Sequence, residues 1–183
     1  MSKLLITGGE GFIGKSLCKK LKVKNYTLSI TSRKSRSRNL DGITIFNVGE
    51  IDDKTKWTKA LVKVDFVIHC AARTHMMKKS DRNSLSFYRN VNVHGTINLA
   101  KQAAANGVKR LIFLSSVKVN GERTSKFSSF NNHNIPNPED AYGISKWEAE
   151  QALWKISKET GLEVVIIRAP LVYGKGMKGK EQF

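Results

Sequence analysis

The stretch Thr7-Gly8-Gly9-Glu10-Gly11-Phe12-Ile13-Gly14 decides the fold of this chain. A short apolar run precedes it, and apolar residues at helical spacing follow it, so the glycines lie in a turn between a strand and a helix. In such a turn Gly8 permits the tight bend, Gly11 leaves room for a pyrophosphate, and Gly14 lets the helix pack close to the strand. The stretch therefore predicts a dinucleotide site at the start of the helix, and the alternative is a glycine-rich turn without a ligand.

The rest of the chain alternates between strands and helices. Strands are expected at residues 3–6, 27–32, 43–48, 66–70, 110–116 and 163–168. Helices are expected at residues 12–21, near 57–61, at 85–105 and at 142–160. This alternation indicates the α/β class, with a Rossmann-type doubly wound parallel sheet of strand order 3-2-1-4-5-6 and helices on both faces.

Composition favours one globular domain with a real core. The chain has 183 residues, 40% of them hydrophobic, and a mean hydropathy of −0.35. No signal peptide is expected because the first residues already form a strand, and no apolar run approaches the ~20 residues of a membrane span. Cys18 and Cys70 make no disulfide framework and favour a reducing cytoplasm, and the four histidines show no metal-ligand spacing.

The net charge of +17 is the unusual feature of the composition. One interpretation is binding of nucleic acid through phosphate contacts. The other is a lysine-rich surface, and the sequence holds no aromatic-interleaved basic platform and no helix-turn-helix. A basic nucleic-acid-binding protein therefore remains a minor alternative.

The end of the second expected strand bears on the choice of cofactor. In an NAD site an acidic residue near this point holds the ribose hydroxyls, and here Ser32 and Arg33 stand in its place. The guanidinium of an arginine suits a 2′-phosphate. We therefore expect NADP to be favoured, with NAD as the alternative, whereas Arg36 and Arg38 fit a basic loop that touches nothing.

Two further sets of residues could take part in chemistry. Tyr142 and Lys146 are four apart and share one face of a helix, although such a pair is by itself an ordinary surface pair. His69 and His75 could act as bases, but His69 lies within a buried strand and fits a structural role better. Ala71 follows that strand, where ligands lie in open α/β sheets.

Together these pieces resemble the extended short-chain dehydrogenase/reductase family, the NAD(P)-dependent epimerases and dehydratases of nucleotide sugars. They occur in family order across nearly the whole chain, and the combination is more specific than any one piece. The matching pieces are Thr7 to Gly14, His69-Cys70-Ala71-Ala72, Asn92-Val93-His94-Gly95-Thr96, Ser115-Ser116 with Val119-Asn120-Gly121, Tyr142-Gly143-Ile144-Ser145-Lys146, and Arg168 through Gly174. The chain is similar to UDP-glucose 4-epimerase-like proteins of bacterial surface-polysaccharide clusters, some of which are 4-keto reductases.

The resemblance implies a catalytic set. Tyr142 corresponds to the tyrosine that exchanges a proton with the reacting oxygen, and Lys146 to the lysine that lowers its pKa and binds the nicotinamide ribose. Ser116 corresponds to the residue that hydrogen-bonds the same oxygen, and its spacing to Gly121 favours it over Ser115.

The resemblance also implies a cofactor-binding set, whereas the spacing of the histidines is the reason that no metal is expected. Asn92 corresponds to a helix asparagine that is structural or functional. The cofactor-binding residues expected are Gly8, Gly11, Phe12, Ile13, Gly14, Ser32, Arg33, Glu50, Ile51, Ala71, Ala72, Tyr142, Lys146 and Pro170.

Family members are longer than this chain by about a domain. We expect residues 1–174 to form the NAD(P)-binding domain and residues 175–183 to begin a truncated substrate domain. The implied activity is epimerase or 4-keto reductase chemistry at C4 of a UDP-hexose or UDP-N-acetylhexosamine, impaired by the truncation. A non-catalytic dinucleotide-binding protein is the alternative, and a homodimer through the helices near 85–105 and 141–160 is a further expectation.

Overall fold

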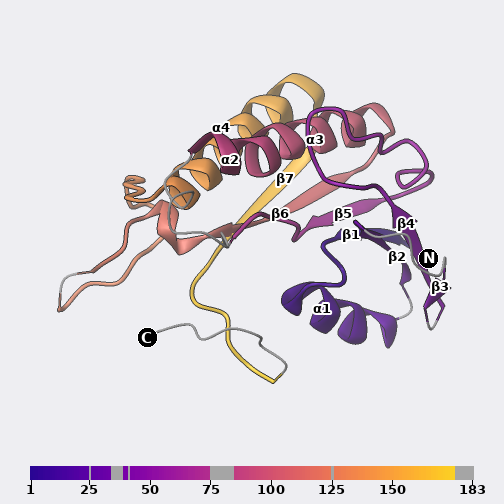
Figure 1. The fold of residues 1–183 in the computed structure, drawn as a ribbon, viewed down its shortest axis with the longest axis horizontal. Helices are drawn as coiled ribbons and strands as arrows, with labels where there is room; N and C mark the ends of the chain where they lie inside the picture. Colours follow the sequence, from indigo (N-terminus) through magenta and orange to yellow (C-terminus); the bar gives the residue numbers. More distant parts are fainter. Residues whose placement is uncertain (25, 34–38, 41, 75–84, 125, 176–183) are drawn as a thin grey trace.

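The computed structural model describes residues 1–24, 26–33, 39–40, 42–74, 85–124 and 126–175. They form one sheet with helices on both faces (Figure 1). The strands are β1 Lys3–Thr7, β2 Thr27–Ser32, β3 Asn39–Leu40, β4 Ile43–Asn47, β5 Phe66–His69, β6 Arg110–Ser116 and β7 Glu163–Ala169. The helical segments are α1 Phe12–Lys22, α2 Leu85–Arg89, η2 Asn90–Gly95, α3 Thr96–Ala105, η3 Val117–Val119 and α4 Ala141–Thr160.

The sheet has the order β3-β4-β2-β1-β5-β6-β7. All pairs are parallel except β3 with β4, which are antiparallel. Without the two-residue β3, this is the predicted parallel order 3-2-1-4-5-6, which is confirmed. The chain reverses direction across the sheet between β1 and β5, and ligands bind at such a switch point outside the carboxyl ends of the strands.

Alternating residues of the strands build a core on each face of the sheet. Leu5 of β1 packs in the larger core with α3 and α4, whereas its neighbours Leu4 and Ile6 pack in the smaller core with α1. Figure 1 shows α1 on one side of the sheet and α2, α3 and α4 on the other. The period of two along a strand thus places one set of side chains under each layer of helices.

Two expected helices differ from prediction. The segment near 57–61 is a run of turns, in which the amides of Ala60 and Leu61 both donate to the Trp57 carbonyl at 2.9 and 3.0 Å. The helix expected over residues 85–105 begins and ends there, but it contains the π-helical segment η2. Gly95 in η2 lies against Ile51, where a Cβ would stand 2.6 Å from a side-chain carbon. A side chain at position 95 would therefore require Ile51 to move.

One part of the sheet has little cover. Val164 and Ile166 of β7 pack against the larger core, so Val165 and Ile167 point to the face that carries α1. Contacts from α1 reach β1 and β2, and Val165 and Ile167 are 39% and 47% exposed.

Among the described residues, no helix has the length and apolar character needed to cross a membrane. Residues 176–183, most of the expected tail, lie outside the described part of the chain.

Candidate functional site

The glycine turn joins β1 to α1 with almost no free space at two of its glycines. Gly8 has a φ of +67°, and a Cβ there would lie 2.8 Å from the Ala71 amide nitrogen. A Cβ on Gly14 would lie 2.2 Å from the Gly8 carbonyl oxygen. These glycines therefore let the start of α1 and the residues after β5 close on the turn, which is a requirement of the fold itself.

Gly11 differs, because a Cβ there would meet the Gly8 carbonyl oxygen alone, at 3.1 Å. Gly11 is the N-cap residue of α1, with φ −74° and ψ 173°, and the first turn of α1 carries no acidic side chain. The first N–H groups of a helix have no acceptor within the helix and favour an anion. The turn thus fits a diphosphate, because the open side of Gly11 meets the positive end of α1.

A buried polar cluster fixes the neighbouring strand ends. His69 is hydrogen-bonded through Nδ1 to the Thr7 hydroxyl at 2.6 Å and through Nε2 to the Thr96 hydroxyl at 2.9 Å. The Ala71 amide donates to the same Thr7 hydroxyl at 3.2 Å. Burial, with a smaller contribution from the charge of Lys146, lowers the pKa of His69 to about 3. The ring is therefore neutral at neutral pH and connects β1, β5 and α3, which supports the structural role. His75 lies outside the described residues.

Charged residues surround the end of β2. The Ser32 hydroxyl donates to a Glu10 carboxylate oxygen at 2.5 Å. The Glu50 carboxylate lies between two guanidiniums, 3.5 Å from Arg33 and 3.6 Å from Arg73. The expected residues of the adenosine region are therefore near one another, and Glu10 and Arg73 join them.

The remaining expected cofactor residues lie along the carboxyl edge of the sheet. Ala72 follows β5 and is half-buried, and Pro170 follows β7 and is exposed. The chain beyond Pro170 returns toward the glycine turn, since a Cβ on Gly174 would lie 3.8 Å from the Phe12 ring. Ile51 is buried in the larger core against η2, and Ile13 is half-buried in α1.

The two serines at the end of β6 have different partners. Ser115 is buried, and its hydroxyl donates to the Glu150 carboxylate at 2.5 Å. Ser116 is the N-cap of η3, where its hydroxyl oxygen accepts a hydrogen bond from the Lys118 amide at 3.2 Å. The alternation along β6 thus directs Ser115 toward α4 and Ser116 to the other side, and the catalytic role of Ser116 stays a prediction.

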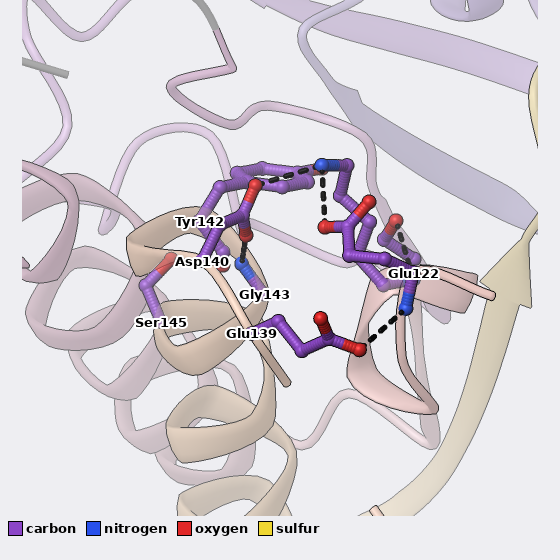
Figure 2. Close-up of polar contacts among 8 residues, drawn as sticks. Glu122, Glu139, Asp140, Tyr142, Gly143 and Ser145 are labelled. Atoms are coloured by element: carbon purple, nitrogen blue, oxygen red, sulfur yellow. Dashed lines mark hydrogen bonds and ion pairs between the residues drawn. The ribbon is translucent and has the colours of Figure 1, made fainter. Parts of the chain in front are cut away.

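Tyr142 lies in the first turn of α4. Asp140 caps this helix by accepting from the Gly143 amide at 2.6 Å, and it also accepts from the Lys118 ammonium at 2.7 Å. Figure 2 shows Asp140 and Gly143 beside Tyr142, and it shows Glu139, which directly precedes Asp140, accepting a hydrogen bond from the Glu122 amide. A Cβ on Gly143 would lie 2.8 Å from the Lys118 carbonyl oxygen, so this glycine allows α4 to begin against η3.

These surroundings do not favour the tyrosinate. Burial and then the charge of Asp140 raise the pKa of Tyr142 to about 12, and Lys118 opposes them. The expectation was that Lys146 lowers this pKa. Lys146 is 1% exposed, and its ammonium lies 3.9 Å from the centroid of the Phe113 ring. Burial lowers the pKa of Lys146 to about 7, although Glu150 raises it.

Asn92 of η2 joins three segments. Its side-chain oxygen accepts from the Arg73 amide at 2.8 Å, and its side-chain nitrogen donates to the Arg73 carbonyl at 3.1 Å and to the Ser145 hydroxyl at 3.0 Å. Asn92 therefore positions the segment after β5 against the helix that carries Tyr142, which supports the structural alternative.

Sequence reasoning missed Glu150, Asp140 and Lys118. Glu150 is 1% exposed and accepts from both Ser115 and the Arg168 guanidinium, the latter at 2.6 Å. The available signal was its position four residues after Lys146, on the same face of α4. Glu150 and Arg168 also line an open cavity of about 550 Å³ beside β7.

Comparison with known proteins gives a consistent result. Residues 4–182 match the model of the NAD dependent epimerase/dehydratase family. A UDP-glucose 4-epimerase of Vibrio cholerae is 45% identical over 175 residues, which are 96% of this chain and 53% of that protein.

Two solved structures share the fold, each at 26% identity. One is a short-chain dehydrogenase/reductase superfamily protein of Agrobacterium tumefaciens with bound NAD, with a TM-score of 0.77 over 91% of this chain and 48% of the other. The other is a UDP-glucose 4-epimerase of Thermotoga maritima with UDP-glucose, with a TM-score of 0.75 over 91% and 54%. The chain thus spans about half the length of these relatives.

The family match covers nearly the whole chain, and it agrees with the order of the strands and with the glycine turn beside Ala71. This chain therefore belongs to the NAD-dependent epimerase/dehydratase family.

Proposed function

We propose that this chain binds a nicotinamide dinucleotide along the carboxyl edge of its sheet and belongs to an oxidoreductase acting at C4 of a UDP-sugar, as an epimerase or a 4-keto reductase. The observation that carries the proposal is the difference between the glycines of the first turn. The fold needs Gly8 and Gly14, but Gly11 is open on the side that faces the helix N-terminus. The Vibrio cholerae epimerase supports the sugar class, and surface-polysaccharide synthesis stays a prediction.

The chain's own residues supply proton transfer and positioning. When bound, a nicotinamide ring accepts and returns a hydride. Tyr142 exchanges a proton with the C4 oxygen, and Ser116 donates a hydrogen bond to the same oxygen. Lys146 binds the ribose in this proposal. Tyr142 needs a nearby positive charge in the bound state, since its surroundings alone raise its pKa to about 12.

We further propose that NADP is favoured over NAD. The support is Arg33, whose side chain is 70% exposed at the end of β2, where a 2′-phosphate would meet it. Titration of NADPH and NADH by fluorescence tests this. Arg33→Ala should remove the preference, and a clear preference for NADH that this variant leaves unchanged would contradict the proposal.

The first experiment compares two glycines of the same turn. Gly11→Ala should fold, because one carbonyl at 3.1 Å is its only close contact, but should weaken NADPH and NADH binding about tenfold or more by filling the diphosphate cradle. Gly14→Ala should lower the melting temperature sharply, because its Cβ would meet backbone at 2.2 Å. Calorimetry and thermal unfolding measure the two effects. Wild-type affinity in a folded Gly11→Ala protein would refute the cradle.

The second experiment tests turnover. For these 183 residues we expect cofactor binding with little or no turnover of UDP-sugars or 4-keto nucleotide sugars, because the relatives contain about as much chain again. Nicotinamide absorbance and analysis of sugar products measure it. Robust turnover would contradict the expectation of impaired activity.

Other outcomes separate the rival functions. Tight cofactor binding without turnover, even in a chimera that carries the remaining part of a relative's chain, would favour a non-catalytic dinucleotide-binding protein. The charge of +17 predicts weak nucleic-acid binding that fades with salt, and sequence-selective binding at physiological salt would favour that rival. A homodimer through the helical segments α2, η2, α3 and α4 and a cytoplasmic setting remain predictions.

A further inference from the structure

A carboxylate stands at the end of β2 although the strand's own sequence supplies none. Ser32 ends this strand, and its hydroxyl donates at 2.5 Å to Glu10, which comes from the glycine turn. In dinucleotide-binding folds, an acidic residue about 20 positions after the glycines binds the ribose 2′-hydroxyl at this place. Here the acidic residue at that place is Glu10, which belongs to the glycine turn before β2 and not to the end of β2 itself.

Backbone contacts hold this arrangement in place. Ser32 is 3% exposed, and its carbonyl accepts from the Val48 amide at 3.1 Å, which ties the end of β2 to the end of β4. Gly9, the neighbour of Glu10, packs on Ile30 of β2 so closely that a Cβ would lie 2.5 Å from a side-chain carbon. The glycine turn is therefore pressed against β2, and the side chain of Glu10 extends along the strand to its end.

The charges at this edge act in opposite directions on a 2′-phosphate. Arg33 would attract it, but Arg33 also lies 3.5 Å from the Glu50 carboxylate. A carboxylate accepts a hydrogen bond from a 2′-hydroxyl and repels a phosphate dianion at the same position. The choice between the two cofactors depends on the balance between Arg33 and the carboxylates.

We propose that Glu10 is a second specificity-determining residue for the cofactor, one that binds the adenosine ribose through its 2′-hydroxyl and disfavours a 2′-phosphate. The inference rests on the proposed function, since it requires a dinucleotide at the glycine turn. Glu10 limits the preference for NADP that Arg33 provides. At this subsite Arg33 favours a 2′-phosphate and Glu10 disfavours it.

The test measures the ratio of NADPH to NADH affinity in matched variants. Glu10→Gln keeps an oxygen that can accept from Ser32 but removes the charge, so it should shift the ratio toward NADPH about fivefold, the size of a partly exposed charge contact. Arg33→Ala should shift the ratio toward NADH. Glu163→Gln removes the same charge at the opposite edge of the sheet, where Glu163 pairs with Arg110 at 2.6 Å, and should leave the ratio unchanged.

The outcomes are distinct. An unchanged ratio in Glu10→Gln, or a shift equal to that of Glu163→Gln, overturns the role of Glu10 and leaves the proposed function standing. Glu10→Ala provides a second variant, which should shift the ratio in the same direction while its melting temperature reports on the turn. Failure of the wild-type chain to bind NADH and NADPH alike refutes the proposed function, and this inference with it.

Discussion

At the scale of single residues, the buried charge of Lys146 lowers the free energy of unfolding. Its ammonium lies over the Phe113 ring at 1% exposure, and burial lowers its pKa from 10.5 to about 7. Between these two pH values the unfolded chain binds more protons at this residue than the folded chain does. The free energy of unfolding therefore rises with pH across this window, by up to about 1.4 kcal/mol per pH unit. Below pH 7 both states are charged, and the penalty is constant.

Lys146→Met should remove this dependence. The methionine fills the same buried space without a charge, so we expect a gain of on the order of 1–3 kcal/mol at pH 7 that shrinks toward pH 10, together with loss of cofactor affinity. Urea unfolding at several pH values measures the difference from wild type. Lys155→Met is the control, because Lys155 is 77% exposed and its loss should not alter the pH slope. Parallel slopes in Lys146→Met and wild type would contradict the expectation.

The same residue shows the limits of reading side chains from sequence. The spacing of four correctly predicted that Tyr142 and Lys146 lie on one helix, but it could not predict their partners. Lys118 opposes the rise in the pKa of Tyr142, and it comes from η3 rather than α4. The contact of Glu10 with Ser32 at the end of β2 was missed for a similar reason, because contacts between distant segments leave no local pattern in the sequence.

At the scale of elements, α4 depends on its first turn. Asp140→Ala removes the cap on the Gly143 amide and should cost about 1–2 kcal/mol. Asp140→Asn keeps an oxygen for the cap, so it should cost much less while removing a charge. Chemical denaturation of the two variants measures the difference, and equal losses would show that the charge rather than the cap stabilises α4.

Asp140→Asn should also lower the pKa of Tyr142. Burial is the main reason for the raised pKa and would remain, but the negative charge beside the phenol would be gone and the Lys118 ammonium would be less neutralised. Carbon NMR of labelled tyrosine gives this pKa directly. Glu139→Gln, which alters a neighbouring carboxylate bonded to the Glu122 amide, should have a smaller effect. An unchanged Tyr142 pKa in Asp140→Asn would contradict the electrostatic argument.

Most elements could be predicted from sequence because their patterns are local. The apolar parallel strands and the long amphipathic helices follow from period and length. The helix predicted near 57–61 was wrong, because Trp57 and Leu61 have helical spacing but are buried in a run of turns. Strand β3 was missed because two residues carry no periodicity, and the π-helical segment η2 was missed because its residues continue the helical pattern of the sequence.

At the scale of the whole molecule, the face of the sheet that carries α1 is covered unevenly. Val165 and Ile167 are more than a third exposed, on a strand with a neighbour on one side. Such an apolar edge favours association. Val165→Thr with Ile167→Thr keeps the strand propensity and should reduce self-association in sedimentation velocity. Ile135→Thr, at an 87% exposed loop position, is the control, and equal effects of both changes would contradict a role for this face.

The central place of β1 affects how the chain folds during synthesis. Leu4 pairs with Leu28 on one side and with Phe66 on the other, so β1 has both of its neighbours only after β5 has been synthesised. Closing that long loop costs entropy before any of its contacts form. A nascent chain that has made β2 but not β5 therefore presents the apolar edge of β1 to its surroundings. We therefore expect chaperones to bind this edge of the nascent chain until β5 joins the sheet.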